Sequence, residues 1–208
     1  MIMCKKIYVT GIGTDVGKTV VSAIVTEALN ADYWKPIQAG DTTFGDTDKV
    51  KALISNSTSK FHPNAYLLNT PMSPHAAAEI DNIVIDINTI VVPKTDNCLI
   101  IEGAGGLLVP LNNTQTILDT IDKSYKVILV SRHYLGSINH TLMSLKILMD
   151  KGYDVSVIFN GTKNLTSEAI ISKMTGVTVI GRIDEESKLT KEIIKKYADL
   201  FKENLQNI

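Results

Sequence analysis

The fold of this chain is decided by one stretch near its start, Ile7-Tyr8-Val9-Thr10-Gly11-Ile12-Gly13-Thr14-Asp15-Val16-Gly17-Lys18-Thr19. The first residues are a short apolar, β-branched run, and small and apolar residues continue after the glycines to Leu29. This pattern predicts a strand, a glycine-rich loop and a helix. Such a loop directs backbone N–H groups and the positive end of the helix dipole at a polyphosphate. We therefore expect a phosphate-binding loop, with Lys18 at the outer phosphates and the Thr19 hydroxyl on Mg²⁺.

The loop departs from the strict pattern of glycine, four residues and Gly-Lys-Ser/Thr, because Ile12 stands where the first glycine is expected. Gly11 and Gly13 flank that position. Asp15 is a second unusual feature, since a carboxylate beside a phosphate loop repels ATP unless it faces a cation. We expect a positively charged second substrate near Thr14 and Asp15.

Composition favours one α/β domain over residues 1–208 with small-molecule partners. Hydrophobic residues make up 44% of the chain, charged residues 21%, and the formal net charge is −1, which gives no electrostatic reason to expect nucleic acid. No apolar run is long enough for a membrane span, so we expect no membrane partner. Cys4 and Cys98 suit small buried residues in a reducing compartment better than a disulfide, which predicts a cytoplasmic location.

The segment 32–48 contains three candidate site residues. Lys35 precedes Pro36 at the predicted end of a second strand, where it either faces the phosphate loop or lies solvated at an edge. Asp46 and Asp48 stand where a helical pattern begins, and each is either a helix cap or a Mg²⁺ ligand.

Four further segments predict the rest of a mostly parallel sheet with helices on both faces. Residues 98–102 read as a buried central strand that ends in Glu102, beside glycines that include Gly105, and this predicts a second metal contact. Residues 126–131 form another strand, followed by a helix start near Gly136 that is either an anion site or a cap by Ser137 or Asn139. Residues 154–159 and 177–181 are expected as the last strands.

Two features near the C-terminal half complete the pattern. Asn160 follows the strand at 154–159 and either pairs with a base edge or makes a turn. Apolar residues between Leu189 and Leu205 have helical spacing with lysines between them, which predicts a helix that packs one face on the domain.

Taken together, the motifs resemble those of the dethiobiotin synthetases over residues 7–181. The matching segments are Thr-Gly-x-x-Thr-Asp-Val-Gly-Lys-Thr from Thr10, Lys-Pro-Ile-Gln-x-Gly from Lys35, Ser-Pro-His from Ser73, Glu-Gly-Ala-Gly-Gly from Glu102 and Leu-Gly-Ser-Ile-Asn-His from Leu135. The displaced glycine of the phosphate loop is the form found in that family. The resemblance implies a P-loop NTPase-like α/β fold and a homodimer. It also implies an ATP-dependent closure of 7,8-diaminononanoate and CO₂ to dethiobiotin, through a carbamate and a mixed anhydride.

The resemblance also implies roles for individual residues. The implied catalytic residues are Thr14, Lys18 and Lys35. The implied nucleotide contacts are Gly13, Thr14, Asp15, Val16, Gly17, Lys18, Thr19, Glu102, Gly105 and Asn160. The implied Mg²⁺ ligands are Thr19, Asp48 and Glu102, with Asp46 as the alternative to Asp48. The implied substrate contacts are Asp15, Lys35, Ala39 and, from the partner subunit, Gly136, Ser137, Ile138 and Asn139. Ala39 replaces the family's usual hydroxyl residue, and Asp184 stands where a proline is common.

A second hypothesis is a conformational switch that resembles the partition and cell-division-positioning ATPases. Those proteins usually carry a lysine early in the loop, where this chain has Gly13 and Thr14. A switch also gives no role to Lys35-Pro36 or to Ser73-Pro74-His75. The sequence therefore favours the synthetase.

Overall fold

The computed structural model describes residues 5–208, and its centre is a parallel sheet of seven strands in the order β4-β2-β6-β1-β7-β8-β9. Cys4 lies outside the described residues. The strands are β1 (Lys6–Gly11), β2 (Asp32–Trp34), β3 (Ile37–Ala39), β4 (Phe61–His62), β5 (Tyr66–Leu68), β6 (Leu99–Gly106), β7 (Lys126–Arg132), β8 (Asp154–Asn160) and β9 (Thr178–Ile183). The helices are α1 (Lys18–Leu29), α2 (Asp46–Leu53), α3 (Pro74–Ile80), α4 (Ser137–Asp150), α5 (Leu165–Thr175) and α6 (Lys191–Gln206), with short 3₁₀ turns η1 (Ile87–Thr89) and η2 (Ile117–Thr120).

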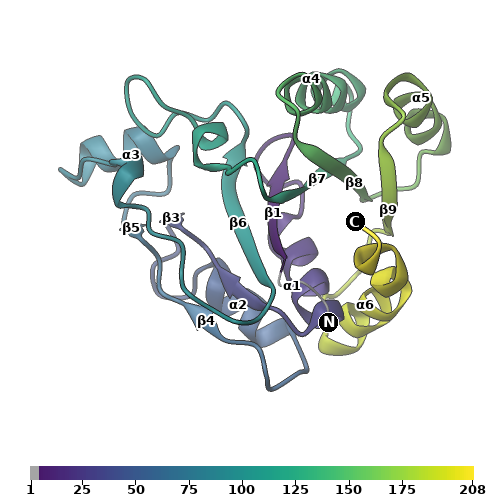
Figure 1. Ribbon diagram of the computed structural model, residues 1–208, viewed down its shortest axis with the longest axis horizontal. Helices are drawn as coiled ribbons and strands as arrows, with labels where there is room; N and C mark the ends of the chain where they lie inside the picture. The colour runs from purple at the N-terminus through teal and green to yellow at the C-terminus, as the bar shows by residue number, and fades with distance from the viewer. Residues whose placement is uncertain (1–4) are drawn as a thin grey trace.

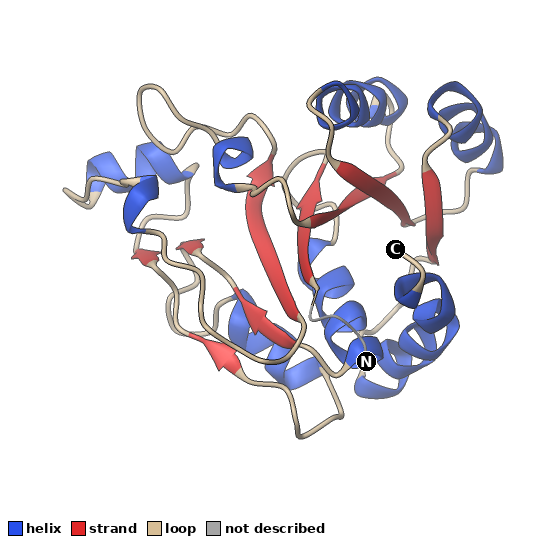
Figure 2. Ribbon diagram, viewed as in Figure 1, coloured by secondary structure: helices blue, strands red, loops and turns tan. Residues whose placement is uncertain are grey.

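Strand β1 lies in the middle of this sheet and decides where the layers form. Its residues alternate between two hydrophobic cores, because successive side chains of a strand point to opposite faces. Tyr8 packs into one core, with residues of α3, α4 and α5, whereas Ile7 and Val9 pack into the other, with residues of α1, α2 and α6. Figures 1 and 2 show α4 and α5 on one side of the sheet and α1 and α6 on the other. The predicted α/β fold with a parallel sheet is confirmed.

The predicted strand–loop–helix at the start is also confirmed, and its geometry explains the unusual glycines. Gly17 has φ 96°, and a Cβ added there would lie 2.2 Å from the Asn160 amide nitrogen. Ile12 has no positive φ, and its N–H donates to the Val130 carbonyl at 3.1 Å. A side chain is therefore tolerated at Ile12, while the close approach falls at Gly11, where a Cβ would lie 2.5 Å from Val16.

The predicted second strand ends just before Lys35, as expected, but the expected loop after Pro36 contains a further short strand, β3. Strand β3 leaves the main sheet and pairs in parallel with β5. Proline has no N–H to continue the ladder, and its carbonyl accepts the N–H groups of Ala65 and Tyr66 instead. This break brings the chain after Lys35 across the end of the sheet.

The C-terminal helix α6 packs against α1 and buries Ile194, Tyr197 and Phe201. The apolar spacing therefore gave the correct face, although the helix begins only after Thr190, whose side chain accepts the Ile193 N–H. Within residues 5–208, no helix combines the length and apolar character that crossing a membrane requires.

Candidate active site

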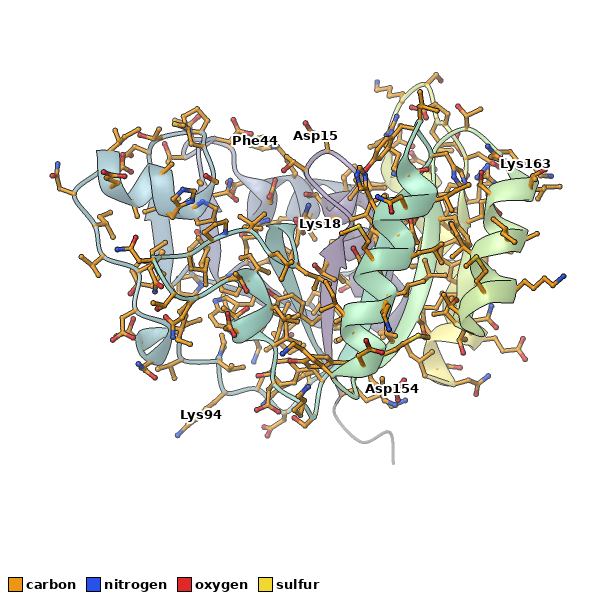
Figure 3. The ribbon with its side chains drawn as sticks, turned by 90° about the horizontal axis from the view of Figure 1, so that it is seen from above. Asp15, Lys18, Phe44, Lys94, Asp154 and Lys163 are labelled. Atoms are coloured by element: carbon orange, nitrogen blue, oxygen red, sulfur yellow. The ribbon has the colours of Figure 1, made fainter. Side chains whose placement is uncertain are left out.

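A cavity of about 660 Å³ lies at the carboxyl ends of β1, β2 and β6. Ligands of open parallel sheets bind at this edge, where the strand order reverses. Figure 3 shows Asp15 and Phe44 at this edge, opposite Lys94 and Asp154. The predicted site residues that line the cavity are Thr14, Asp15, Gly17, Lys18, Thr19, Lys35, Ala39, Glu102 and Gly105. One cavity thus contains residues from the phosphate loop, the segment after β2 and the end of β6.

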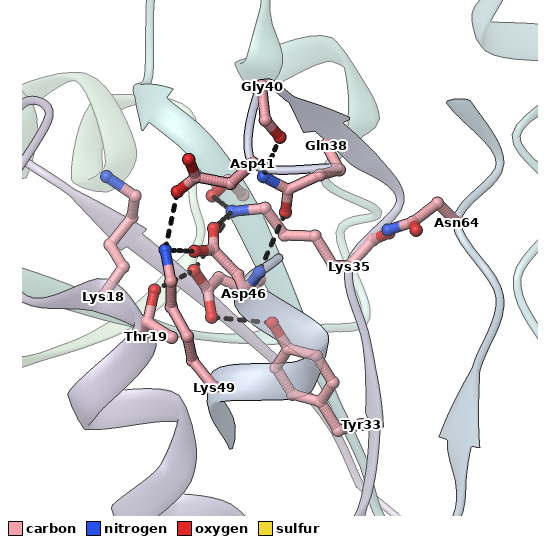
Figure 4. A network of polar contacts seen from close by, with 12 residues as sticks. Lys18, Thr19, Tyr33, Lys35, Gln38, Gly40, Asp41, Asp46, Lys49 and Asn64 are labelled. Carbon is pink, nitrogen blue, oxygen red and sulfur yellow. Dashed lines mark hydrogen bonds and ion pairs between the residues drawn. The ribbon is translucent and has the colours of Figure 1, made fainter. Parts of the chain in front are cut away.

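The Lys35 ammonium group is the centre of the polar network in Figure 4. Its Nζ lies 2.8 Å from Asp46 Oδ2 and 3.1 Å from Glu102 Oε1, and it donates to the Gly103 carbonyl. Lys35 is only 4% exposed. The solvated-edge alternative is therefore wrong, and this lysine is held between two carboxylates.

Lys35 and the carboxylates around it keep one another charged, as the directions of their pKa shifts indicate. Burial alone would lower the pKa of Lys35, but Glu102 and Asp46 outweigh it and raise that pKa. Burial would raise the pKa of Asp46, but Lys35 and Lys49 outweigh it and lower that pKa. Lys35 and Asp46 are thus both held in their charged forms.

Lys18 has a different environment, although it faces the same cavity. Burial, followed by the nearby charge of Lys35, lowers the pKa of Lys18 to about 8. Its Nζ donates to the Gly13 carbonyl at 2.8 Å, so the side chain folds back over its own loop. No salt bridge of the described residues includes Lys18, so an anionic ligand would stabilise its charge.

Thr19 and Glu102, two of the expected metal ligands, are in direct contact, with Thr19 Oγ1 donating to Glu102 Oε1 at 2.9 Å. Asp46 is near the same oxygen, because Lys35 bridges it to Glu102. The three side chains offer only oxygen donors, the type that Mg²⁺ prefers. The described residues contain no group of three or more His, Cys, Asp or Glu arranged to hold a metal, and this site offers two carboxylates with a hydroxyl.

Asp48, the metal ligand expected from the resemblance, has a different position. It is exposed, it does not line the cavity, and its Oδ2 accepts the Gly45 N–H at 3.0 Å. As the third residue of α2, its carboxylate turns back to cap the helix, whereas Asp46, the first residue, faces the cavity. The geometry therefore favours Asp46 over Asp48 as the candidate ligand.

Three other expected nucleotide residues lie in or against the phosphate loop. The buried Asn160 side chain donates to the Val16 carbonyl at 2.8 Å, so it braces the loop. Gly13 supplies the carbonyl that receives Lys18. Neither Gly13, Val16 nor Asn160 is part of the cavity wall.

The segment Gly136, Ser137, Ile138 and Asn139 lines a second cavity of about 790 Å³, at the start of α4. Gly136 has φ 98° and precedes the helix, and no side chain caps it. The expected caps by Ser137 or Asn139 are therefore absent. Nearby Leu135 is fully exposed and Met143 is half exposed. These residues share no wall with the phosphate-loop cavity of the same chain.

Sequence reasoning missed Tyr33 and the pair Asp41–Lys49. Lys49 Nζ lies 2.8 Å from Asp41 Oδ2 and 3.5 Å from Asp46 Oδ1, at the cavity wall. The buried Tyr33 hydroxyl donates to Glu102 Oε2 at 2.9 Å. The two-residue period of a strand places Tyr33 on the same face as Lys35, which was the available signal.

The fold and the phosphate-loop cavity define a P-loop nucleotide-binding protein of the parallel-sheet type. Residues 5–193 match a family model described as "AAA domain". A Borrelia burgdorferi plasmid partition protein superposes with a TM-score of 0.59 at 18% identity, covering 98% of this chain and 99% of that one. The MinC:MinD cell division complex of Aquifex aeolicus gives 0.56, also at 18%, covering 98% and 93%. At such identities the likeness establishes the fold alone.

The curated relatives are far more similar. An ATP-dependent dethiobiotin synthetase BioD of Christiangramia forsetii is 57% identical, over 99% of this chain and 100% of the relative. The protein of the same name from Cytophaga hutchinsonii is 48% identical, over 93% and 95%. The chain belongs to the ATP-dependent dethiobiotin synthetase family.

Proposed function

We propose that this chain closes 7,8-diaminononanoate and CO₂ into dethiobiotin with consumption of ATP. The observation that carries the proposal is the cavity in which the buried Lys35 faces the phosphate loop, in a chain 57% identical to a named synthetase. The switch hypothesis has no use for a buried lysine held between carboxylates at the end of a strand.

Lys18 and the loop amides are proposed to bind the nucleotide phosphates. Helix α1 begins at Lys18, so its positive end faces the same point. The lowered pKa of Lys18 rises again once a triphosphate supplies the missing negative charge. Asn160 is proposed to contact the nucleotide base while it supports the loop.

Thr19, Asp46 and Glu102 are proposed to hold Mg²⁺, which supplies charge neutralisation for the phosphates. Two carboxylates and one hydroxyl suit an ion that keeps phosphate oxygens and water among its ligands. An ion held there would neutralise Asp46 and Glu102, and the Lys35 ammonium group would then be available to the reacting groups.

Lys35 is proposed to stabilise the substrate carbamate and the phosphoryl group in transfer. The amine adds to CO₂ and loses a proton, the carbamate oxygen attacks the γ-phosphorus with departure of ADP, and the second amine displaces phosphate to form the cyclic urea. Negative charge develops at the oxygens in the first two steps, so a fixed cation is the appropriate catalyst. Thr14 and Asp15 are exposed on the cavity wall and are proposed to contact the diamine.

The start of α4 is proposed to bind the substrate carboxylate across a homodimer interface. The segment from Gly136 to Asn139 and the phosphate loop do not share a cavity in one chain, and exposed apolar residues such as Leu135 surround the segment. The buried free thiol of Cys98 supports the proposed cytoplasmic location.

The test is ADP release by the purified protein with ATP, Mg²⁺ and bicarbonate, with and without 7,8-diaminononanoate, together with mass analysis of the product. We expect turnover that depends on the diamine and yields dethiobiotin. Slow hydrolysis that ignores the diamine would refute the proposal and favour a switch.

A further inference from the structure

The two carboxylate oxygens of Glu102 have different partners. Oε1 accepts hydrogen bonds from Thr19 and Lys35, at 2.9 and 3.1 Å. Oε2 accepts one from the Tyr33 hydroxyl, at 2.9 Å. Thr19 is proposed above to bind the metal and Lys35 to stabilise the reacting oxygens, whereas Tyr33 has neither role.

Tyr33 is held rigidly, so it can fix the orientation of the carboxylate. It is fully buried in β2, between β4 and β6, and its ring packs against Phe61 with centroids 5.9 Å apart. The Tyr33 hydroxyl is the donor in its bond to Glu102, and the carboxylate oxygen is the acceptor.

We propose that Tyr33 is a positioning residue that holds Oε2 of Glu102 and presents Oε1 alone to the cation. The inference rests on the proposed Mg²⁺–ATP site. Mg²⁺ requires near-ideal octahedral geometry, while Ca²⁺ accepts both oxygens of one carboxylate. Tyr33 thus contributes to metal affinity and also to the preference for Mg²⁺ over Ca²⁺.

The test compares Tyr33→Phe with Tyr153→Phe in the full chain. Both substitutions remove one buried phenol hydrogen bond, but the Tyr153 hydroxyl donates to the Ile121 carbonyl, at 2.9 Å, and touches no site residue. Mn²⁺ binding is measured by electron paramagnetic resonance with a non-hydrolysable ATP analogue, and Ca²⁺ and Mg²⁺ are compared by competition. Binding of the analogue without metal is measured in parallel.

We expect Tyr33→Phe to bind Mn²⁺ about tenfold more weakly, as is typical when an outer-shell partner of a metal ligand is lost. Competition by Ca²⁺ should strengthen relative to Mg²⁺, while metal-free binding of the analogue stays unchanged. Tyr153→Phe should match the unaltered protein in every measurement. Unchanged Mn²⁺ affinity in Tyr33→Phe overturns the inference, and so does an equal loss of metal-free nucleotide binding.

Should Tyr33→Phe fail to fold, nuclear magnetic resonance of the unaltered protein with ¹³Cζ-labelled tyrosine provides the test. The tyrosine resonances are assigned from Phe variants at the other tyrosines, which leaves the Tyr33 resonance. The Tyr33 resonance should shift when Mg²⁺ joins the bound analogue, and the Tyr153 resonance should not. A stationary Tyr33 resonance refutes the role. These measurements do not depend on ring closure. A protein that binds the metal but forms no dethiobiotin would therefore refute the proposed function without refuting the role of Tyr33.

Discussion

The two cavities at the carboxyl edge of the sheet differ in how their polar groups are balanced. In the phosphate-loop cavity, Lys35, Asp46 and Glu102 are linked by ion pairs of 2.8 and 3.1 Å within one chain. The cavity at the start of α4 has a histidine–carboxylate contact in its wall, with His133 Nε2 2.9 Å from Glu168 Oε1, in place of a lysine between two carboxylates. Its rim carries the exposed Leu135 and the partly exposed Ile138.

This difference separates two tasks. Buried charges have a high desolvation cost, so the chain that buries them must also supply their partners. A helix start surrounded by exposed apolar residues is suited instead to a ligand or a second chain that covers it. We infer that each phosphate-loop cavity handles the phosphates by itself and receives its contact to the substrate carboxylate from the partner's α4.

The largest expected effect comes from removing the cation of the balanced cavity. Lys35→Ala should lower turnover by about 10³-fold, the upper range for loss of one group that stabilises developing negative charge. Single-turnover measurement of ADP formation with the diamine tests this. Near-normal product formation would remove Lys35 from the mechanism.

The same variant tests how far the ion pairs stabilise the fold. Without Lys35, the buried Glu102 and the partly buried Asp46 each lose an ion pair, which costs about 3 kcal/mol. Denaturant unfolding should show this loss, and Mg²⁺ should recover part of it by taking the place of the ammonium group. If Mg²⁺ gives no recovery, Asp46 and Glu102 do not form a cation site.

The shared-site inference can be broken by changing the other cavity. Ile138→Asp should lower kcat/KM for the diamine by about 100-fold, because like charges brought together cost several kcal/mol, and should leave the KM for ATP unchanged. In a hybrid of one Ile138→Asp subunit and one Lys35→Ala subunit, Lys35 of the first subunit meets the unaltered α4 of the second. This hybrid has one complete site. It should therefore regain about half the activity of the unaltered dimer.

That hybrid is prepared by co-expression with two affinity tags. The controls are the two homodimers, each of which lacks both complete sites. A hybrid as inactive as its parents would show that α4 serves the phosphate loop of its own chain.

Asp46→Asn and Asp48→Asn form a matched pair that sharpens the first cavity. Asp46→Asn should raise the Mg²⁺ concentration for half-maximal activity by about tenfold or more, because it removes a proposed ligand. Asp48→Asn should leave that requirement unchanged and lower the free energy of unfolding by about 1 kcal/mol, since it weakens a helix cap. The opposite outcome would restore Asp48 as the ligand.

The sequence was sufficient for the parts of this molecule that depend on local pattern. The apolar runs and the glycine loop predicted the parallel sheet, and the carboxyl-edge rule placed Glu102 beside the loop and gave this position as one of two for Lys35. The choice between Asp46 and Asp48 was not accessible, because two residues at the start of one helix point in different directions and only the cap geometry separates them.

Contacts between distant segments also escaped sequence reasoning. Tyr33 meets Glu102 across 69 residues, and only the register of β2 with β6 brings them together. The break at Pro36 was visible as a missing donor, but the pairing of β3 with β5 was not. Such contacts depend on which strands become neighbours, and local periodicity does not encode this.

The smallest expected effect concerns Lys18, whose ammonium group donates to the Gly13 carbonyl. With a pKa of about 8, most of its side chains are charged at about pH 7, and about one in ten is charged at about pH 9. Nucleotide binding requires the charged form, so each binding event above the pKa must take up a proton. Affinity for ATP should therefore fall about tenfold over this range. The triphosphate is already ionised, and Lys35, whose pKa is raised, stays charged.

Calorimetric titration at both pH values provides the measurement, with Lys18→Met as the control that should bind weakly without this pH dependence. Equal ATP affinities of the unaltered protein at the two pH values would mean that Lys18 keeps its charge without the nucleotide. Lys18 and Lys35 would then not differ in how their charges are balanced.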